Sequence, residues 1–154
     1  SVMFCLSKGL GAPVGSVLAG TQQFIKQARL ARKAFGGGMR QAGVLAAAGI
    51  VALEQSPKGL ANDHVNARYL ADCLSRMPGI EINPAEVQTN ILVFDISGTG
   101  LDTPEFCARL REKGILANSI EAARIRIVTH FDVTRQDCER AVNVMEEILK
   151  KSAA

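Results

Sequence analysis

Residues 2–16 of this 154-residue chain, VMFCLSKGLGAPVGS, contain the clearest indication of its fold. Residues 2–6 form an uninterrupted apolar run, which is typical of a buried β-strand, and residues 7–13 contain the glycines and the proline of a turn. Residues 14–19 are mostly apolar and predict a second strand, paired with the first through this turn. Lys8 therefore lies directly after the first strand, beside a compact loop.

Lys8 has the features of a candidate nucleophile. A lysine amine reacts as a nucleophile only when a fraction of it is neutral, as a result of desolvation or of nearby cations. Residues 1–53 contain six Lys and Arg residues and no Asp or Glu, whereas the rest of the chain carries 12 of the 18 basic and all 15 acidic residues. This asymmetry, which a net charge of +3 conceals, indicates an anionic partner for the first third of the chain. The alternative for Lys8 is a solvated turn.

Residues 24–35 have helical spacing, and Lys26, Arg29 and Lys33 form a basic stripe on one side of this predicted helix. A solvated helix face explains Lys26 and Arg29. RNA binding is an alternative for the stripe, but the sequence has few aromatic residues on which bases could stack.

Three consecutive glycines, residues 36–38, precede a second predicted helix at about residues 39–54. Backbone N–H groups at the start of a helix bind phosphate readily, and glycines expose them. Arg40 falls in the first turn of this helix, where the helix dipole disfavours a cation unless an anion compensates. A flexible hinge between two helices is the alternative. Because the second helix is rich in small apolar residues, we expect it to be buried.

The clearest boundary in the chain is the segment SPKG at residues 56–59, where the charge balance changes sign. Beyond it we predict a small α/β module, with helices at residues 60–77, 103–113 and 134–150 and strands at 80–82, 90–96, 115–117 and 125–129. On the last strand, Arg124, Arg126, Val128 and His130 would share one face. Arg126, which lies between two isoleucines near the end of a strand, is a candidate bidentate clamp for a carboxylate. The alternative, an edge-strand arginine that faces solvent, applies more to Arg124 than to Arg126.

Several classes of protein are disfavoured by composition. The longest apolar run, residues 42–53, is too short to cross a bilayer. The four cysteines are at least 30 positions apart and there are only two histidines, which argues against a zinc site or a disulfide framework and favours reduced thiols in the cytoplasm. A first residue other than Met is typical of a processed chain or of a piece of a longer one.

Four motifs, taken together, resemble the low-specificity L-threonine aldolases, which are pyridoxal-phosphate (PLP) enzymes of the aspartate-aminotransferase-like fold, also called fold type I. The long motifs are CLSKGLGAPVGS at residues 5–16 and GGGMRQAG at residues 36–43, and the short ones are QTNI at 88–91 and RIVTHFDV at 126–133. The resemblance implies an α/β chain in which residues 1–57 are the C-terminal part of the large PLP-binding domain with its linking helices. Residues 58–154 would then be the small C-terminal α/β domain.

The resemblance also implies roles for individual residues. Lys8 would form the Schiff base with the cofactor, Arg40 would help to hold the cofactor phosphate across a subunit interface, and Lys33 would lie close to the substrate. Arg126 would bind the substrate carboxylate, and no metal is expected. The implied reaction is retro-aldol cleavage of L-threonine or L-allo-threonine to glycine and acetaldehyde, with the pyridine ring as electron sink.

Members of this family are roughly twice as long as this chain, a length that is typical of two-domain proteins. The missing N-terminal half, from the same or a separate chain, would carry the His that stacks on the cofactor ring and the Asp that pairs with its nitrogen. We expect a homodimer or homotetramer without nucleic-acid or membrane partners. The alternatives are a related PLP lyase for other β-hydroxy or β-substituted amino acids, such as a phenylserine aldolase or a β-eliminating lyase, and a non-catalytic assembly fragment.

Overall fold

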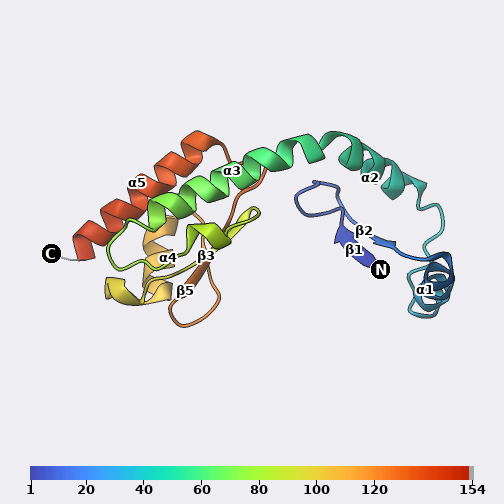
Figure 1. The fold of residues 1–154 in the computed structure, drawn as a ribbon, viewed down its shortest axis with the longest axis horizontal. Coiled ribbons are helices and arrows are strands. Elements are labelled where there is room, and N and C mark those ends of the chain that lie inside the picture. The colour runs from blue at the N-terminus through green and yellow to red at the C-terminus, as the bar shows by residue number, and fades with distance from the viewer. Residues whose placement is uncertain (153–154) are drawn as a thin grey trace. The chain divides into compact units, whose positions relative to one another are not determined.

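The computed structural model describes residues 1–152, which divide into two compact units after Leu60 (Figure 1). We refer to residues 1–60 as unit 1 and to the remainder as unit 2. This division comes from the contacts within this chain and is not a comparison with the domains of the family. The expected family domains, residues 1–57 and 58–154, therefore stay a prediction.

Unit 1 begins with the predicted hairpin. Strand β1 (Val2–Cys5) pairs antiparallel with β2 (Ser16–Ala19), with Cys5 opposite Ser16. The intervening loop is closed by backbone hydrogen bonds, since the Leu6 N–H donates to the Gly15 carbonyl and the Ala12 N–H to the Leu6 carbonyl, both at 2.9 Å. Both strands are thus confirmed, in a sheet of only two strands.

Two helices follow in unit 1. Helix α1 (Gln22–Ala34) starts at Thr21, whose hydroxyl accepts a hydrogen bond from the Phe24 N–H. Helix α2 (Gly43–Gln55) starts four residues later than predicted. The cause is a turn in which Gln41 has a left-handed backbone conformation, with φ of +51°, so the regular helical hydrogen bonds begin only after it.

The prediction that α2 is buried is wrong for this structure. Only Gly49 and Ala52 are buried in this helix, and the close approach expected of its small residues occurs only at Gly49, where a Cβ would lie 3.1 Å from Leu6 Cδ1. Of the large aliphatic residues of α2, Leu45 is half-buried and the others are exposed, namely Val44, Ile50, Val51 and Leu53. A helix that is apolar on all sides is stable in water only when other parts of the protein cover all of its sides. Unit 1 covers only the side of α2 that carries Gly49 and Ala52.

Unit 2 contains a three-stranded antiparallel sheet in the order β3 (Ile91–Asp95), β5 (Arg124–Val128), β4 (Asn118–Ser119). Helix α3 (Pro57–Leu74) leads into it from unit 1, and helices α4 (Thr103–Glu112) and α5 (Arg135–Ser152) complete it. Two predicted strands differ from the structure. Residues 80–82 contribute a single bridge, Glu81 to Asp95, and the strand predicted at 115–117 is instead β4.

The core of unit 2 lies on one face of its sheet. Along β5, Ile125 and Ile127 are buried while Arg124, Arg126 and Val128 are exposed. The apolar side chains of the helices pack with the buried face of β3 and β5; the large fully buried ones include Phe94, Phe106, Leu74, Leu92, Ile96, Leu110, Ile125 and Met145. Unit 2 therefore has a closed core of its own.

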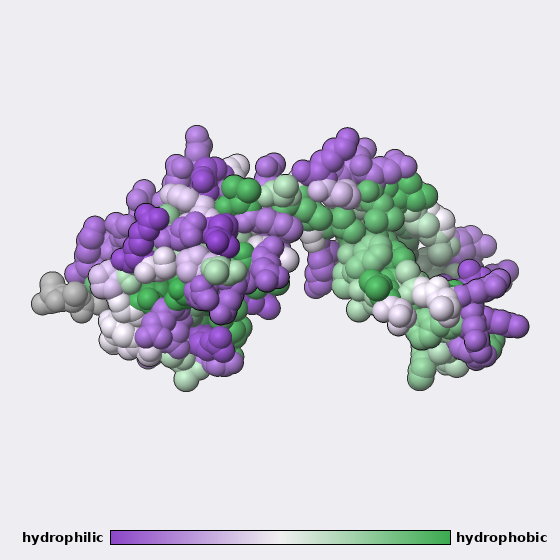
Figure 2. Space-filling model, viewed as in Figure 1, coloured by the Kyte–Doolittle hydropathy of each residue, from purple (hydrophilic) through white to green (hydrophobic). Residues whose placement is uncertain are grey.

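The two units differ in the surface that they expose. Figure 2 shows apolar surface gathered over β1, β2 and α2. In the described chain, 13 of the 19 exposed large hydrophobic residues belong to unit 1, and its buried hydrophobic residues are only Ala12 and Ala52. Within residues 1–152, no helix has both the length and the apolar character needed to cross a membrane.

Candidate active site

Lys8 lies in the tight loop that joins β1 to β2, as the sequence predicts. The Gly11 N–H donates to the Lys8 carbonyl at 2.8 Å, and Gly11 has the positive φ that this turn requires, +74°. The loop is also attached to the α2–α3 junction, because the Ser56 hydroxyl donates to the Leu10 carbonyl at 2.6 Å. The backbone of Lys8 is thus fixed, while its side chain is exposed.

Gly9 allows this loop to lie close to the start of α3. A Cβ added to Gly9 would stand 2.9 Å from Leu60 Cδ2. A side chain at this position would have to displace the end of the Leu60 side chain, which lies against the loop beside Lys8.

The three glycines have a different role from the predicted one. The Gly36 N–H donates to the Lys33 carbonyl and the Gly37 N–H to the Arg32 carbonyl, at 3.2 and 2.8 Å. Two of the three N–H groups therefore complete the C-terminal end of α1, where a left-handed glycine is usual; Gly36 has φ of +82°. The prediction that these glycines expose N–H groups at the start of α2 is wrong.

Arg40 is exposed in the turn that precedes α2, outside the helix. The expected conflict between its charge and the helix dipole therefore does not arise. Its neighbour Gln41 is the one non-glycine residue with positive φ among the described residues. Such a conformation is unfavourable for a residue with a Cβ, and strained backbone of this kind often occurs at functional sites.

Lys33 is placed by the glycine turn. A Cβ added to Gly38 would lie 2.9 Å from Lys33 Cδ and 3.3 Å from Lys33 Nζ. The Lys33 side chain therefore runs across Gly38, and its amine lies beside the turn that leads to Arg40.

Arg126 occupies the central strand of unit 2, opposite Val93 of β3 and Asn118 of β4. It lies on the exposed face with Arg124 and Val128, as predicted. Arg124 forms an ion pair with Glu121 at 3.5 Å, whereas the structure of residues 1–152 gives Arg126 no acidic partner. Of the two arginines, Arg126 is therefore the one whose guanidinium is available to bind an anion.

His130 lies outside the predicted strand, because β5 ends at Val128. Its ring is half-buried, with Nδ1 3.2 Å from Asp132 Oδ1 and a tilted contact to the Phe131 ring at 4.3 Å between centroids.

Asn90 and Thr129 hold the end of β5. The Asn90 amide donates to the Thr129 carbonyl at 2.8 Å, and the Thr129 N–H donates to the Asn90 carbonyl at 2.9 Å. The buried Thr129 hydroxyl donates to the carbonyl of Asp63 on α3 at 2.6 Å. These bonds fix the register that places Arg126 on the exposed face. Only the motif similarity of residues 88–91 and 126–133 hinted at this pair.

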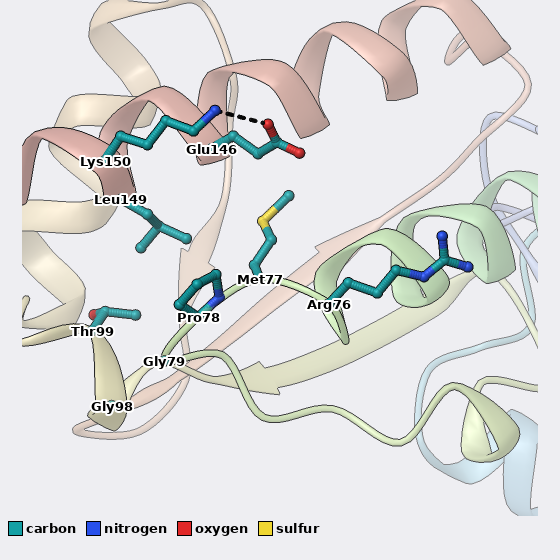
Figure 3. A pocket seen from close by; sticks show the side chains of 9 residues that line it. All are labelled: Arg76, Met77, Pro78, Gly79, Gly98, Thr99, Glu146, Leu149 and Lys150. Carbon is teal, nitrogen blue, oxygen red and sulfur yellow. Dashed lines mark hydrogen bonds and ion pairs between the residues drawn. The ribbon is translucent and has the colours of Figure 1, made fainter. Parts of the chain in front are cut away.

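The predicted site residues belong to different units: Lys8, Lys33 and Arg40 to unit 1, and Arg126 to unit 2. None of them lines the cavity of about 430 Å³ shown in Figure 3, which is in unit 2. Around that cavity, Lys150 is paired with Glu146 at 3.3 Å, and the Arg76 side chain extends away from the other labelled side chains.

Comparison with known proteins identifies the class. Residues 1–97 match the model of the beta-eliminating lyase family, so the chain belongs to this family. The fold is similar to that of a putative L-allo-threonine aldolase from Listeria monocytogenes, with a TM-score of 0.71 and 16% identity over 94% of this chain and 43% of that one. The predicted fold class, part of the α/β fold type I of PLP-dependent enzymes, is confirmed.

Curated relatives are more similar in sequence. The chain is 45% identical over 150 residues to low-specificity L-threonine aldolase 1 of Arabidopsis thaliana, covering 97% of this chain and 42% of the relative. It is 40% identical over 136 residues to the low specificity L-threonine aldolase of Escherichia coli K12, covering 88% and 39%. The resemblance inferred from the four motifs is thus confirmed, and the chain spans about two fifths of the length of these relatives.

Proposed function

We propose that this chain forms part of a PLP-dependent lyase that cleaves L-threonine or L-allo-threonine to glycine and acetaldehyde. The observation that carries the proposal is Lys8, held in a hydrogen-bonded loop directly after β1, inside a segment without acidic residues. The similarity to L-threonine aldolases over nearly the whole chain supports the same reaction.

The donor set of unit 1 fits the cofactor. PLP carries an aldehyde and a phosphate, which require an amine and cations respectively. Lys8 supplies the amine, and Arg40 supplies a planar guanidinium that can bind phosphate oxygens in pairs. The absence of Asp and Glu from residues 1–53 leaves no competing carboxylate in this segment. When bound, the cofactor supplies the electron sink for the carbanion of glycine.

Lys33 and Arg126 act on the substrate in this proposal. Lys33 contributes a positive charge near the glycine turn, where Gly38 gives its side chain room. Arg126 holds the substrate carboxylate in this proposal. The neighbouring Arg124 forms an ion pair with Glu121, whereas Arg126 has no acidic partner among residues 1–152, so Arg126 is the better candidate to bind an anion. The Asn90–Thr129 hydrogen bonds act as positioning contacts for Arg126.

The rest of the site is contributed by the portion of the family fold that this chain does not span. The proposal includes a homodimeric or homotetrameric enzyme in the cytoplasm, with Arg40 at the phosphate of a neighbouring subunit. The support for this assembly is the similarity to the relatives together with the exposed position of Arg40.

The test is a chimera in which this chain replaces the matched stretch of the E. coli relative. We expect the chimera to bind PLP, with a change in cofactor absorbance, and to release acetaldehyde from threonine. Lys8→Ala should abolish both signals, whereas Lys26→Ala, a cation on the solvated face of α1, should retain them. A Lys8→Ala chimera that keeps the absorbance change and the cleavage would refute the proposal.

A second arm of the test concerns Arg126. Arg126→Ala should mainly raise KM for threonine, while the control Arg124→Ala should leave KM nearly unchanged. An unaltered KM in the Arg126 variant would remove this residue from carboxylate binding.

A further inference from the structure

The loop that carries Lys8, residues 6–15, contacts α2 and the start of α3 at three points. Its helical partners in these contacts are Gly49, Ser56 and Leu60. Spacings of seven and four residues put the three partners on one side of a helix, and Ser56, between α2 and α3, has helical backbone angles. The Lys8 loop is therefore supported along one side of a helical segment.

Ser56 holds this loop by a hydrogen bond. Its half-buried hydroxyl donates to the Leu10 carbonyl at 2.6 Å. The same peptide group carries the Gly11 N–H, which donates to the Lys8 carbonyl at 2.8 Å. Because a peptide group is planar and rigid, the two hydrogen bonds form one chain from the Ser56 hydroxyl to the backbone of Lys8. Hydrogen bonds linked in this way strengthen each other.

We propose that Ser56 is a positioning residue for Lys8 and acts through the peptide group between Leu10 and Gly11. In the proposed function, on which this inference rests, the Lys8 amine reacts with the cofactor aldehyde. A misplacement of about 1 Å at a reacting group can lower a rate by roughly 100-fold. The Lys8 side chain is exposed, so the position of its amine depends on how the loop backbone is held.

The composition of the loop makes an outside anchor necessary. Glycines are present at positions 9, 11 and 15, and Gly11 and Gly15 have φ of +74° and +121°. Glycine adopts such conformations without a steric cost, but it also has more alternative conformations than any other residue. The loop can therefore form its turn easily and leave it easily, and a contact from outside the loop limits this freedom.

The hydroxyl of Ser56 contributes something that the other two contacts do not. A Cβ added to Gly49 would lie 3.1 Å from Leu6 Cδ1, and one added to Gly9 would lie 2.9 Å from Leu60 Cδ2. These apolar contacts set how closely the loop lies on the helices, but they have no preferred direction. A hydrogen bond is directional and so sets the orientation of the peptide group. The hydroxyl at position 56, rather than its volume, should therefore matter.

One arm of the test needs no cofactor and uses the 154-residue chain. Ser56→Ala should make the Gly11 amide exchange its hydrogen about tenfold faster, because the loop opens more often. Ser56→Thr keeps a hydroxyl and should restore slow exchange. The matched control is Thr21→Ala, which removes another hydroxyl of unit 1, the one that accepts from the Phe24 N–H. This control should leave Gly11 exchange unchanged.

The other arm uses the chimera with the E. coli relative, loaded with PLP. Ser56→Ala should lower kcat for threonine cleavage about tenfold and leave KM nearly unchanged, because it displaces Lys8 and not the groups that bind substrate. The pH midpoint of the cofactor absorbance should also shift, since the surroundings of the Lys8 nitrogen change. Ser56→Thr should restore kcat and the midpoint, and Thr21→Ala should leave both as in the parent.

Two results would overturn the inference. One is Gly11 exchange in Ser56→Ala as slow as in the parent chain, and the other is faster exchange with kcat and the pH midpoint both unchanged, which would make Ser56 a structural residue only. Equal effects of Thr21→Ala and Ser56→Ala would have the same meaning. If the parent chimera binds no PLP, the proposed function fails, and the exchange rates alone decide whether Ser56 holds the Lys8 loop.

Discussion

The Lys33 side chain lies directly across Gly38, where a Cβ would stand 2.9 Å from Lys33 Cδ. The turn after α1 therefore sets the position of the Lys33 amine, and the turn can lie this close only because residue 38 has no side chain. Lys33 and the glycines of the motif GGGMRQAG thus form one local structure, although they are separate features in the sequence.

Gly38→Ala should displace Lys33 without unfolding the protein, because the clash is with the flexible end of a side chain. In the E. coli chimera we expect a KM for threonine raised several-fold, with a melting temperature close to that of the parent. The matched control is Gly43→Ala, at the start of α2, where nothing lies within 4 Å of the added Cβ. Equal KM values for the two variants would show that Lys33 does not act at the substrate.

Gln41 should tolerate glycine but not a β-branched residue. Its left-handed backbone, with φ of +51°, costs an L-residue about 1–2 kcal/mol. We expect Gln41→Gly to leave the free energy of unfolding unchanged or to raise it, and Gln41→Val to lower it by about 1 kcal/mol or more. Denaturant unfolding of the chimera measures both, and a Val variant as stable as the Gly variant would mean that the turn adopts another conformation.

Thr129→Val should destabilise unit 2. The substitution keeps the shape of the side chain but leaves the Asp63 carbonyl without the donor that reaches it at 2.6 Å in a buried position. Such a loss costs about 1–3 kcal/mol. Ser75→Ala is the control, because the Ser75 hydroxyl also donates to a backbone carbonyl, that of Asp72, but in an exposed position. Denaturant titration should separate the two, and equal effects would contradict a buried role for Thr129.

The start of α5 should make stability depend on pH in the acid range. Hydrogen bonds from the Thr134 hydroxyl and N–H hold the pKa of Asp137 below its ordinary value. A carboxyl with a lowered pKa in the folded state stabilises the fold above its unfolded pKa, near 4, and loses this effect as the pH falls through the folded pKa. The stability difference between the parent and Asp137→Asn should therefore be present at pH 7 and shrink below pH 4. A difference that is constant over this range would exclude this role of the carboxylate.

Local features of the sequence were sufficient for the hairpin and for the position of Lys8. An apolar run followed by a turn rich in glycine and proline determines both, because strand and turn propensities act over a few residues. The alternation of Arg126 with buried isoleucines was predictable on the same ground.

Features that depend on distant partners were not predictable from the sequence. The glycines 36–38 are compatible with both the end of one helix and the start of the next, and the left-handed Gln41 decides between them. β4 begins three residues later than the predicted strand, at Asn118 instead of residue 115, because its register is set by β5. The Asn90–Thr129 contact joins residues 39 positions apart, for which local periodicity contains no signal.

The exposed apolar surface of unit 1 has a consequence for biosynthesis. A ribosome completes unit 1 before unit 2, and at 5–20 residues per second the remaining residues require roughly 5–20 s more. Throughout that interval the nascent chain exposes the apolar side chains of β1, β2 and α2, which unit 2 does not need for its own core. Chaperone binding during translation should therefore concentrate on the first third of the chain.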